Sequence, residues 1–281
     1  MTIKIVTDST CDLPSTLVAR YGITVIPLYI NAGEQSYLDD SQLSRASFYQ
    51  WLAQNDLPVT TAAPGPNIFL QTYQWLIAEG ATAIISIHLA GNLSATFANA
   101  CAAAKEVSAV PVKVIDSQQL SLGTGFLAVT AAKAAGDGYS PDQIEAQLTG
   151  QIPRTYLFAI LDDLDFLARS GRANHALARL GSLLQIKPVF KVYCGLPTTE
   201  RVRTYKQALK RVTSLATERT PFDYLGIIHS NSPEKAQSLR HQIQSLLSEP
   251  DILVADVSPI IAAHVGPGAV GVVCVAGRYE I

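Results

Sequence analysis

The segment Ile84–Thr96, IISIHLAGNLSAT, contains the pattern that decides the fold: an apolar run, a turn and the start of a helix. The β-branched run is typical of a buried strand, Gly91-Asn92 predicts a turn, and a helix is expected to begin at about Ser94. Comparable runs alternate with helical patterns, at Ile3–Val6, Thr24–Ile30, Ala83–Ile87 and Val112–Ile115. Continuous apolar strands separated by helices predict a parallel sheet covered on both faces, so we expect residues 1–150 to form a three-layer α/β domain.

The spacing of the candidate strands changes after Gly150. They become irregularly spaced, at Tyr156–Ile160, Val189–Tyr193, Leu225–His229, Ile252–Val257 and Val270–Val275. Thr198–Thr204 is typical of the second arm of a hairpin that turns at Gly195-Leu196-Pro197. We therefore place a domain boundary near Gln151 and expect residues 151–281 to form a second α/β domain with a mixed sheet.

The charge and the cysteines of the chain exclude several classes of site. The 281 residues carry a net charge of −2, which gives no broad positive field of the kind that a nucleic-acid backbone requires, so a nucleic-acid partner is not expected. The cysteines are widely separated, with no C-x-x-C pair and no histidine at ligand spacing: Cys11, Cys101, Cys194 and Cys274. They predict reduced thiols and no metal site.

Two stretches bear on the location of the protein. The N-terminal residues enter a strand pattern at once, without the apolar segment of a signal peptide. The most apolar stretch, Ile252–Ala276, is interrupted by Asp256, His264 and Pro267, so a membrane span is not expected. We expect a cytoplasmic protein.

A cationic segment lies within Leu161–Phe190. Its acidic start and Arg169 near its end predict a short helix, and Gly171 is placed where a left-handed cap would close that helix. Arg172 follows directly, and a second apolar helix is expected at Ala176–Leu184. The segment predicts a fixed platform that presents positive charge for recognition.

Polar residues follow two of the expected strands. Ser94 lies at or next to a helix N-terminus, where unpaired N–H groups favour a bound carboxylate or phosphate. Alternatively, its hydroxyl caps its own helix. Thr7–Thr10 lies at the carboxyl end of the first strand, where open α/β sheets bind ligands. These side chains equally suit the turn before a helix that begins near Leu13-Pro14.

Two further motifs leave alternatives open. His264 precedes a Gly-Pro-Gly turn and, taken alone, is either a structural residue or a ligand contact; His88 and His229 are weaker candidates. Gly123–Ala128 matches G-x-G-x-x-A, a pattern of dinucleotide-binding sites. The preceding strand ends near Asp116, too far before the motif, so close helix packing explains these glycines better than a nicotinamide site.

An ordered set of short motifs resembles the DegV family of bacterial fatty-acid-binding proteins. The motifs are TDSTCDLP at residues 7–14, LSATF at residues 93–97, VIDS at residues 114–117, a Gly-Arg turn before SLLQIKP at residues 182–188, and HVGPG at residues 264–268. The set extends along the whole chain. The resemblance implies two α/β domains that enclose one long acyl chain.

The resemblance also implies roles for individual residues. Ser94 matches the serine that binds the fatty-acid carboxylate in that family, Thr61 in the Pro-rich loop Thr60–Pro64 matches a threonine contact, and His264 matches a histidine at the head group. Supporting positions are Ser9, Thr10, Gly123 and Gly266. Four positions depart from the family pattern and leave individual contacts open: Ala62, Ala63, Ala95 and Val265.

The resemblance further implies a protein partner. In the family, a separate ATP-dependent kinase subunit phosphorylates the bound carboxylate, and the binding protein then carries the acyl-phosphate. Arg172 and Arg203 match positions linked to kinase docking, although both equally suit solvated surface ion pairs. The chain is then a carrier rather than an enzyme, and ATP and Mg²⁺ belong to the partner. The alternative function is a self-contained hydrolase that uses Ser94 and His264.

Overall fold

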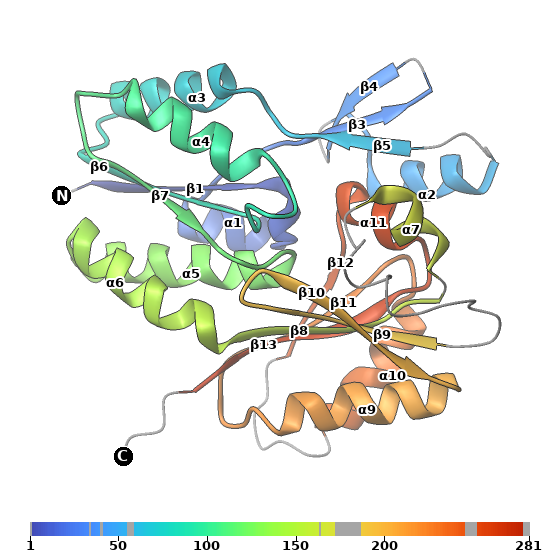
Figure 1. Ribbon diagram of the computed structural model, residues 1–281. Helices are drawn as coiled ribbons and strands as arrows, with labels where there is room; N and C mark the ends of the chain where they lie inside the picture. The colour runs from blue at the N-terminus through green and yellow to red at the C-terminus, as the bar shows by residue number, and fades with distance from the viewer. Residues whose placement is uncertain are drawn as a thin grey trace.

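The computed structural model describes residues 2–33, 35–39, 42–54, 59–162, 164–171, 187–244 and 252–277. They form two large β-sheets and a small one, with helices packed between and around them (Figure 1). The expected α/β class, with a parallel first sheet and a mixed second sheet, is confirmed. Among the described helices, none combines the length and the apolar character that a membrane crossing requires.

The first sheet is parallel and has the strand order β2-β1-β6-β7. Its strands are β1 (Ile3–Asp8), β2 (Thr24–Ile26), β6 (Ala83–His88) and β7 (Val112–Asp116). Helices cover both faces: α3 (Pro66–Ala78) and α4 (Thr96–Lys105) on one, and α1 (Ser15–Tyr21), α5 (Leu122–Gly136) and α6 (Pro141–Gln151) on the other (Figure 1). Val6 packs toward α3 and its neighbour Ile5 toward α5, because successive side chains of a strand point to opposite faces.

A small antiparallel sheet in the order β4-β3-β5 lies beside the first sheet (Figure 1). It consists of β3 (Tyr29–Ala32), β4 (Gln35–Leu38) and β5 (Val59–Ala62), and α2 (Arg45–Gln54) lies near it. The expected single strand at Thr24–Ile30 is therefore wrong. Pro27 has no N–H to continue the ladder, and the N–H of Leu28 donates to Ser9 Oγ at 3.1 Å. This break leads the chain from the first sheet into the small one.

The second sheet is mixed and has the order β10-β9-β8-β13-β11-β12. β11 and β12 pair in parallel, and the other neighbours are antiparallel. The expected strands are confirmed, with small differences at their ends: β8 (Thr155–Ile160), β9 (Lys187–Tyr193), β11 (Phe222–His229), β12 (Leu253–Asp256) and β13 (Val270–Ala276). Short η2 (Ile152–Arg154) joins α6 to β8.

The hairpin between β9 and β10 (Leu196–Val202) is tighter than expected. Tyr193 pairs with Leu196, so the turn consists of Cys194 and Gly195, and Pro197 belongs to the strand. Both turn residues have positive φ, 48° and 77°, which is the geometry of a two-residue hairpin turn. The turn was expected at Gly195-Leu196-Pro197, and the structure places it at Cys194-Gly195.

Helix α5 is buried between the two large sheets, with 11 of its 15 residues inaccessible. Close packing at both ends of this contact requires glycine. A Cβ on Gly125 would lie 2.6 Å from the carbonyl oxygen of Cys11 in η1 (Ser9–Cys11), and a Cβ on Gly226 of β11 would lie 2.5 Å from Leu122 Cδ1. The interpretation of the Gly123–Ala128 motif as close helix packing is confirmed.

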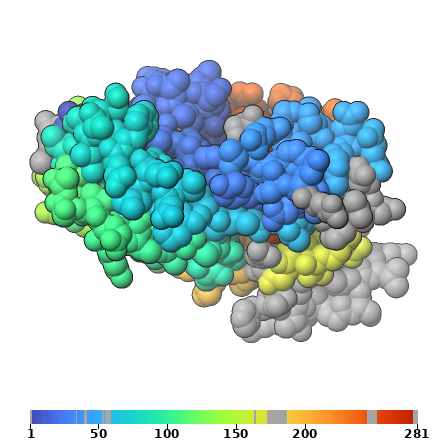
Figure 2. Space-filling view, turned by 90° about the horizontal axis from the view of Figure 1, so that it is seen from above, coloured from blue at the N-terminus to red at the C-terminus, as the bar shows by residue number. Residues whose placement is uncertain are grey.

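The remaining helices enclose the second sheet. Helices α9 (Tyr205–Thr217) and α10 (Pro233–Gln244) cover its outer face, whereas α7 (Asp165–Ser170) and α11 (Pro259–Val265) lie toward the small sheet (Figure 1). Figure 2 shows α7 (yellow) directly beside the small sheet (blue). The left-handed cap at Gly171 is confirmed, with φ of 69°. Arg172 and the helix expected at Ala176–Leu184 lie outside the described residues.

Candidate functional site

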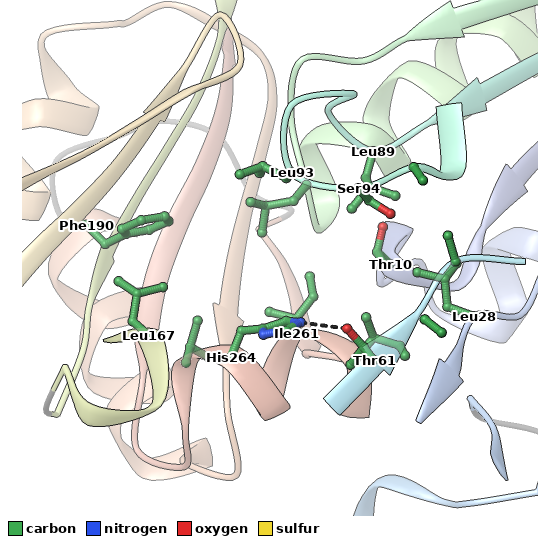
Figure 3. A pocket seen from close by; sticks show the side chains of 16 residues that line it. Thr10, Leu28, Thr61, Leu89, Leu93, Ser94, Leu167, Phe190, Ile261 and His264 are labelled. Atoms are coloured by element: carbon green, nitrogen blue, oxygen red, sulfur yellow. Dashed lines mark hydrogen bonds between the residues drawn. The ribbon is translucent and has the colours of Figure 1, made fainter. Parts of the chain in front are cut away.

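A cavity of about 210 Å³ lies where the small sheet, the loop after β6, α11 and the second sheet meet (Figure 3). Four of its lining residues are polar: Thr10, Thr61, Ser94 and His264. The other walls are apolar and include Leu28, Leu89, Leu93, Leu167, Phe190 and Ile261. Thr10 and Ser94 lie on one side of the space and Phe190 and Leu167 on the other, so the cavity suits a ligand with one polar and one apolar end (Figure 3).

Ser94 lies in the loop between β6 and α4. The helix begins at Thr96, two residues later than expected, and Ser94 Oγ accepts a 3.2 Å hydrogen bond from the Thr96 N–H. A second hydrogen bond, of 2.8 Å, joins the hydroxyls of Ser94 and Thr96. Ser94 therefore supports the start of its own helix and also lines the cavity, so the two hypotheses raised by the sequence are compatible.

Thr61 and His264, which are 203 residues apart, meet across the cavity. Thr61 Oγ1 lies 2.9 Å from His264 Nε2, a hydrogen bond that Figure 3 marks. The expectation that Thr61 lies in a loop is wrong: it belongs to β5, where it pairs with Ile30. The strand fixes the backbone of Thr61, and the last turn of α11 fixes His264.

The supporting residues Ser9 and Thr10 belong to η1, directly after β1. Thr10 lines the cavity, whereas Ser9 lines a different cavity on the other side of η1. Ser9 contributes indirectly, because its hydroxyl accepts the N–H of the cavity residue Leu28. Asp8 caps η1 by accepting the N–H of Thr10 at 3.1 Å.

The supporting glycines Gly123 and Gly266 are not among the residues that line the cavity. A Cβ on Gly123 would lie 2.9 Å from Gln119 Cβ. Gly266 closes α11 with φ of 71°, and a Cβ there would lie 2.5 Å from the Phe166 ring of α7. Both glycines permit close packing of the elements that carry the site, and any direct contact with ligand stays a prediction.

A buried polar chain that the sequence did not indicate extends from Thr10 into the first sheet. Asp8 Oδ2 lies 3.0 Å from His88 Nδ1, and His88 Nε2 lies 2.7 Å from Ser86 Oγ. The hydroxyl of Tyr73 donates to Ser86 Oγ at 2.9 Å. All of these side chains are fully buried. His88, which the sequence analysis ranked as a weaker candidate, thus connects the core of the sheet to the edge of the cavity.

Two further cavities adjoin the site. A distal cavity of about 30 Å³, lined by Ala159 and Gly271 among others, shares four wall residues with the first: Leu120, Phe190, Ile261 and Val265. A larger cavity of about 490 Å³ lies on the other side of η1. Its lining includes the charged residues Asp12, Asp39 and Arg45 and the apolar residues Val18 and Val25. The first two cavities are separated by mostly apolar residues that they share, whereas the third has charged residues in its walls.

The cysteines are unpaired, and burial acts on the thiols of two of them. The four cysteines are free thiols. Burial raises the pKa of Cys274 to about 12 and raises the pKa of Cys11 above its ordinary value, so neither is a thiolate at neutral pH. Within the part of the chain that the structure describes, no three His, Cys, Asp or Glu side chains are grouped as metal ligands.

The two arginines of the expected docking surface are placed unequally. Arg203 is exposed, directly after β10 and before the Thr204 cap of α9. Arg172 lies outside the described residues, although the cap that precedes it, Gly171, is present as expected. Of the two arginines named from the sequence, Arg203 is therefore the one whose exposure the structure describes.

The apolar walls of the site were missed by reasoning from sequence. Leu167, Phe190 and Ile261 come from three different elements and read as ordinary core residues, because an apolar side chain gives the same signal whether it faces another side chain or a cavity. Leu89 and Leu93 carried a usable signal, since they flank the Gly91-Asn92 turn before Ser94.

Comparison with known proteins identifies the family. The model described as "Uncharacterised protein, DegV family" matches residues 2–277. A DegV domain-containing protein of Streptomyces coelicolor is 35% identical over 276 residues, which cover 96% of this chain and 97% of that protein.

Two solved structures resemble the whole chain. A DegV-family protein from Thermus thermophilus, described as fatty acid binding, has a TM-score of 0.91 at 30% identity and covers 99% of this chain and 100% of its own. DegV from Bacillus subtilis, described as a fatty acid binding protein, has a TM-score of 0.90 at 30% identity and covers 98% and 99%. The chain belongs to the DegV family.

Proposed function

We propose that this protein binds one long-chain fatty acid, with the carboxylate at Thr61, Ser94 and His264 and the acyl chain against the apolar walls. The observation that carries the proposal is the division of one cavity into a polar side and an apolar side (Figure 3). The two relatives described as fatty acid binding support it, because each is similar over nearly the full chain.

The chemistry of the walls suits each part of a fatty acid. Transfer of the chain from water contributes about 0.8 kcal/mol for each buried methylene. The carboxylate needs hydrogen-bond donors once it leaves water, and each such bond to a charged group contributes about 1.5 to 3 kcal/mol. Ser94 and Thr61 would supply hydroxyl donors: when His264 Nε2 carries its proton, the ring donates to Thr61 Oγ1, and the Thr61 hydroxyl is then left to donate to the carboxylate.

The acyl chain would continue from the first cavity into the distal one. The two share Phe190, Leu120, Ile261 and Val265 as walls, and the distal cavity is closed by small residues such as Ala159 and Gly271. A long chain therefore has an apolar path toward the inner face of the second sheet.

Binding is tested by native mass spectrometry of lipid-free protein titrated with palmitate. We expect a single added mass of one fatty acid that saturates at one equivalent. Octanol of equal concentration is the control, because it lacks a carboxylate. A protein that binds no palmitate, or binds several molecules without saturation, contradicts the proposal.

We further propose that the bound acid is presented to a separate kinase for acyl-phosphate formation. The exposed guanidinium of Arg203 supports this step, because paired N–H donors suit phosphate and carboxylate groups of a partner. The residue that the family resemblance pairs with it, Arg172, is the second candidate. Here the chain is a carrier, and ATP and Mg²⁺ are bound by the partner.

The kinase step is tested with Arg203→Glu and Arg172→Glu and a DegV-associated fatty acid kinase. We expect unchanged palmitate binding and melting temperature, loss of acyl-phosphate production in the double variant, and slower association, most clearly at low salt. Arg201→Glu, two residues earlier on β10, is the matched control. Normal turnover by the double variant contradicts the docking role and leaves lipid binding unaffected.

The hydrolase alternative requires Ser94 to be activated by His264. In the structure Ser94 Oγ bonds to Thr96, and His264 Nε2 bonds to Thr61. An activated serine would need its base within hydrogen-bond reach. These contacts favour two separate head-group ligands over a nucleophile and its base.

A further inference from the structure

A buried carboxylate lies directly behind the polar side of the cavity. Oδ1 of Asp8 accepts hydrogen bonds from the Thr10 N–H at 3.1 Å and from the Thr10 hydroxyl at 2.5 Å. Oδ2 accepts the N–H of Leu89 at 3.1 Å and lies 3.0 Å from His88 Nδ1. Thr10 and Leu89 both line the cavity, so one layer of residues separates Asp8 from it.

The hydrogen bonds of this cluster fit one arrangement of protons, with an ionised Asp8 and a neutral His88. Two donors to Asp8 are backbone N–H groups, and hydrogen bonds to an ionised carboxylate stabilise the ionised form. On the other side of the cluster Tyr73 donates to Ser86, which leaves the Ser86 hydroxyl to donate to His88 Nε2. A neutral His88 then donates its Nδ1–H to Asp8. In this arrangement the cluster holds one negative charge in the interior.

This charge determines what Thr10 offers to a ligand. Its hydroxyl donates to Asp8, so the lone pairs of Thr10 Oγ1, rather than its hydrogen, are available to the cavity. In Figure 3 the oxygens of Thr10 and Ser94 point toward one another at the polar side. An ionised carboxylate placed there meets an acceptor, with the Asp8 anion behind it.

The described walls provide no permanent positive charge to offset that anion. None of the described residues that line the cavity is Lys or Arg. Among them, His264 is the side chain that can take up a proton near neutral pH. Two cations of neighbouring elements contact other groups: Lys187 Nζ binds Asp162, and Arg169 Nε binds the backbone carbonyl of Asp165.

Charged groups on the other side of η1 line a different cavity, although Asp12 and Arg45, like Asp8, act electrostatically on Cys11 of η1. Asp12 accepts hydrogen bonds from the Ser121 hydroxyl at 2.5 Å and the Ser258 N–H at 2.7 Å, which direct its carboxylate toward α5 and α11. Asp12 and Arg45 line the larger cavity rather than the fatty-acid site. Asp8 is therefore the described anion whose hydrogen-bond partners form the wall of the site.

We propose that the protein takes up one proton from solvent when a fatty acid binds, and that Asp8 is the positioning residue that imposes this uptake. The inference rests on the proposed function. A like charge close by disfavours ionisation of a second group, and a buried anion without a cation is costly. A proton on the acid gives Thr10 a donor, and a proton on His264 gives the carboxylate a cation. In both arrangements the complex holds one more proton than its separated parts.

The sign of the pH dependence follows from this count. At pH 8 a free carboxyl group is ionised and a free histidine is neutral, because their ordinary pKa values are about 4.3 and about 6.5. Binding then adds one proton, so the affinity falls as the pH rises. A full proton corresponds to about a tenfold loss of affinity for each pH unit above pH 8.

Isothermal titration calorimetry of the lipid-free wild-type protein tests the uptake. Dodecanoate, below its micelle concentration, is titrated at pH 8 in phosphate and in Tris, which differ in ionisation enthalpy. We expect the observed enthalpies to differ by the amount that one proton per bound ligand requires. Equal enthalpies in the two buffers, with binding intact, overturn the inference but not the proposed function. Failure of dodecanoate and palmitate to bind at all overturns both.

Paired substitutions test the role of Asp8. In Asp8→Asn, folding being verified by circular dichroism, we expect the uptake to fall well below one proton and the affinity to become nearly independent of pH between pH 7.5 and 9. Asp12→Asn is the matched control, an equally buried carboxylate on the other side of η1, and is expected to keep the full uptake. A folded Asp8→Asn that still takes up one proton overturns the role of Asp8. If this variant does not fold, the wild-type buffer comparison still decides whether a proton is taken up.

Discussion

The two cavities that border η1 differ in chemistry more than in size. The larger, about 490 Å³, is lined by Asp12, Asp39 and Arg45, whereas the smaller, about 210 Å³, has hydroxyls and one histidine on one side and apolar walls elsewhere. Ligand pockets are mostly apolar with a few convergent polar groups. The character of the wall, rather than the volume, therefore favours the smaller cavity as the proposed fatty-acid site.

Consecutive residues of one short helix separate these environments. Ser9 lines the larger cavity and Thr10 the smaller, because successive side chains of a 3₁₀-helix point in directions about 120° apart. Asp8 holds the start of η1, and Gly125 of α5 packs against its end at Cys11. The division therefore depends on a few close contacts, which the following substitutions test.

The largest effect is expected from closing the passage between the first and the distal cavity. Val265→Trp places an indole where the two meet and excludes about four methylenes, at about 0.8 kcal/mol each, so palmitate should bind about 200-fold more weakly. Octanoate should be affected much less. Both affinities are measured by competition against a fluorescent fatty acid.

The matched control for this substitution lies in the other cavity. Val18→Trp adds the same side chain to the larger, charged cavity, and we expect palmitate affinity to change less than about twofold, within the scatter usual for a substitution outside a binding site. If Val18→Trp lost much of its palmitate affinity and Val265→Trp lost none, the fatty acid would have to bind in the larger cavity instead of the smaller one.

A smaller loss is expected from removing one head-group donor. Ser94→Ala should weaken palmitate binding by about 1.5 to 3 kcal/mol, roughly 10- to 150-fold, and should cost about 1 kcal/mol of folding stability through the lost support of α4. Thr61→Ala should act in the same direction, and the double variant should lose less than the sum, because both residues hold one head group.

Thr60→Ala is the control for these variants, since Thr60 precedes Thr61 on β5 and is exposed. Its palmitate affinity should equal that of the wild type in the same competition assay. Unchanged affinity in the Ser94→Ala, Thr61→Ala double variant would place the carboxylate elsewhere.

The smallest effect concerns the wall between the cavities and is one of stability. Gly125→Ala places a Cβ 2.6 Å from the Cys11 carbonyl oxygen, and such overpacking costs about 1 to 3 kcal/mol, so the melting temperature should fall by several degrees. In the same helix, a Cβ on Gly136 would meet no atom within 4 Å, so Gly136→Ala should be neutral or slightly stabilising. Equal melting temperatures in calorimetry would show that η1 adjusts freely.

The sequence predicted the sheets well where a strand is a continuous apolar run. β1, β6 and β7 follow from such runs, since a buried parallel strand is apolar on both faces. The division of Thr24–Ile30 was predictable only in part: Pro27 interrupts the run, whereas the N–H of Leu28 reaching Ser9 is a contact that forms only after folding.

The site was predictable in its polar residues and not in the rest. Ser94, Thr61 and His264 stand in motifs that resemble those of a family. They come from three separate parts of the structure and line one cavity, where Thr61 and His264 are hydrogen-bonded. Asp8 and His88 are 80 residues apart and stand in no joint pattern, so their pairing required the sheet register that places β1 beside β6.

The position of the bound acid tests the central claim most directly. Crystals of the protein with 16-bromohexadecanoic acid would locate both ends of the ligand by density and by the anomalous signal of bromine. We predict the carboxylate within hydrogen-bond reach of Ser94 and Thr61, and the bromine beyond Phe190, in or beside the distal cavity. A carboxylate bound at Arg45, or bromine in the cavity lined by Val18, would contradict the account.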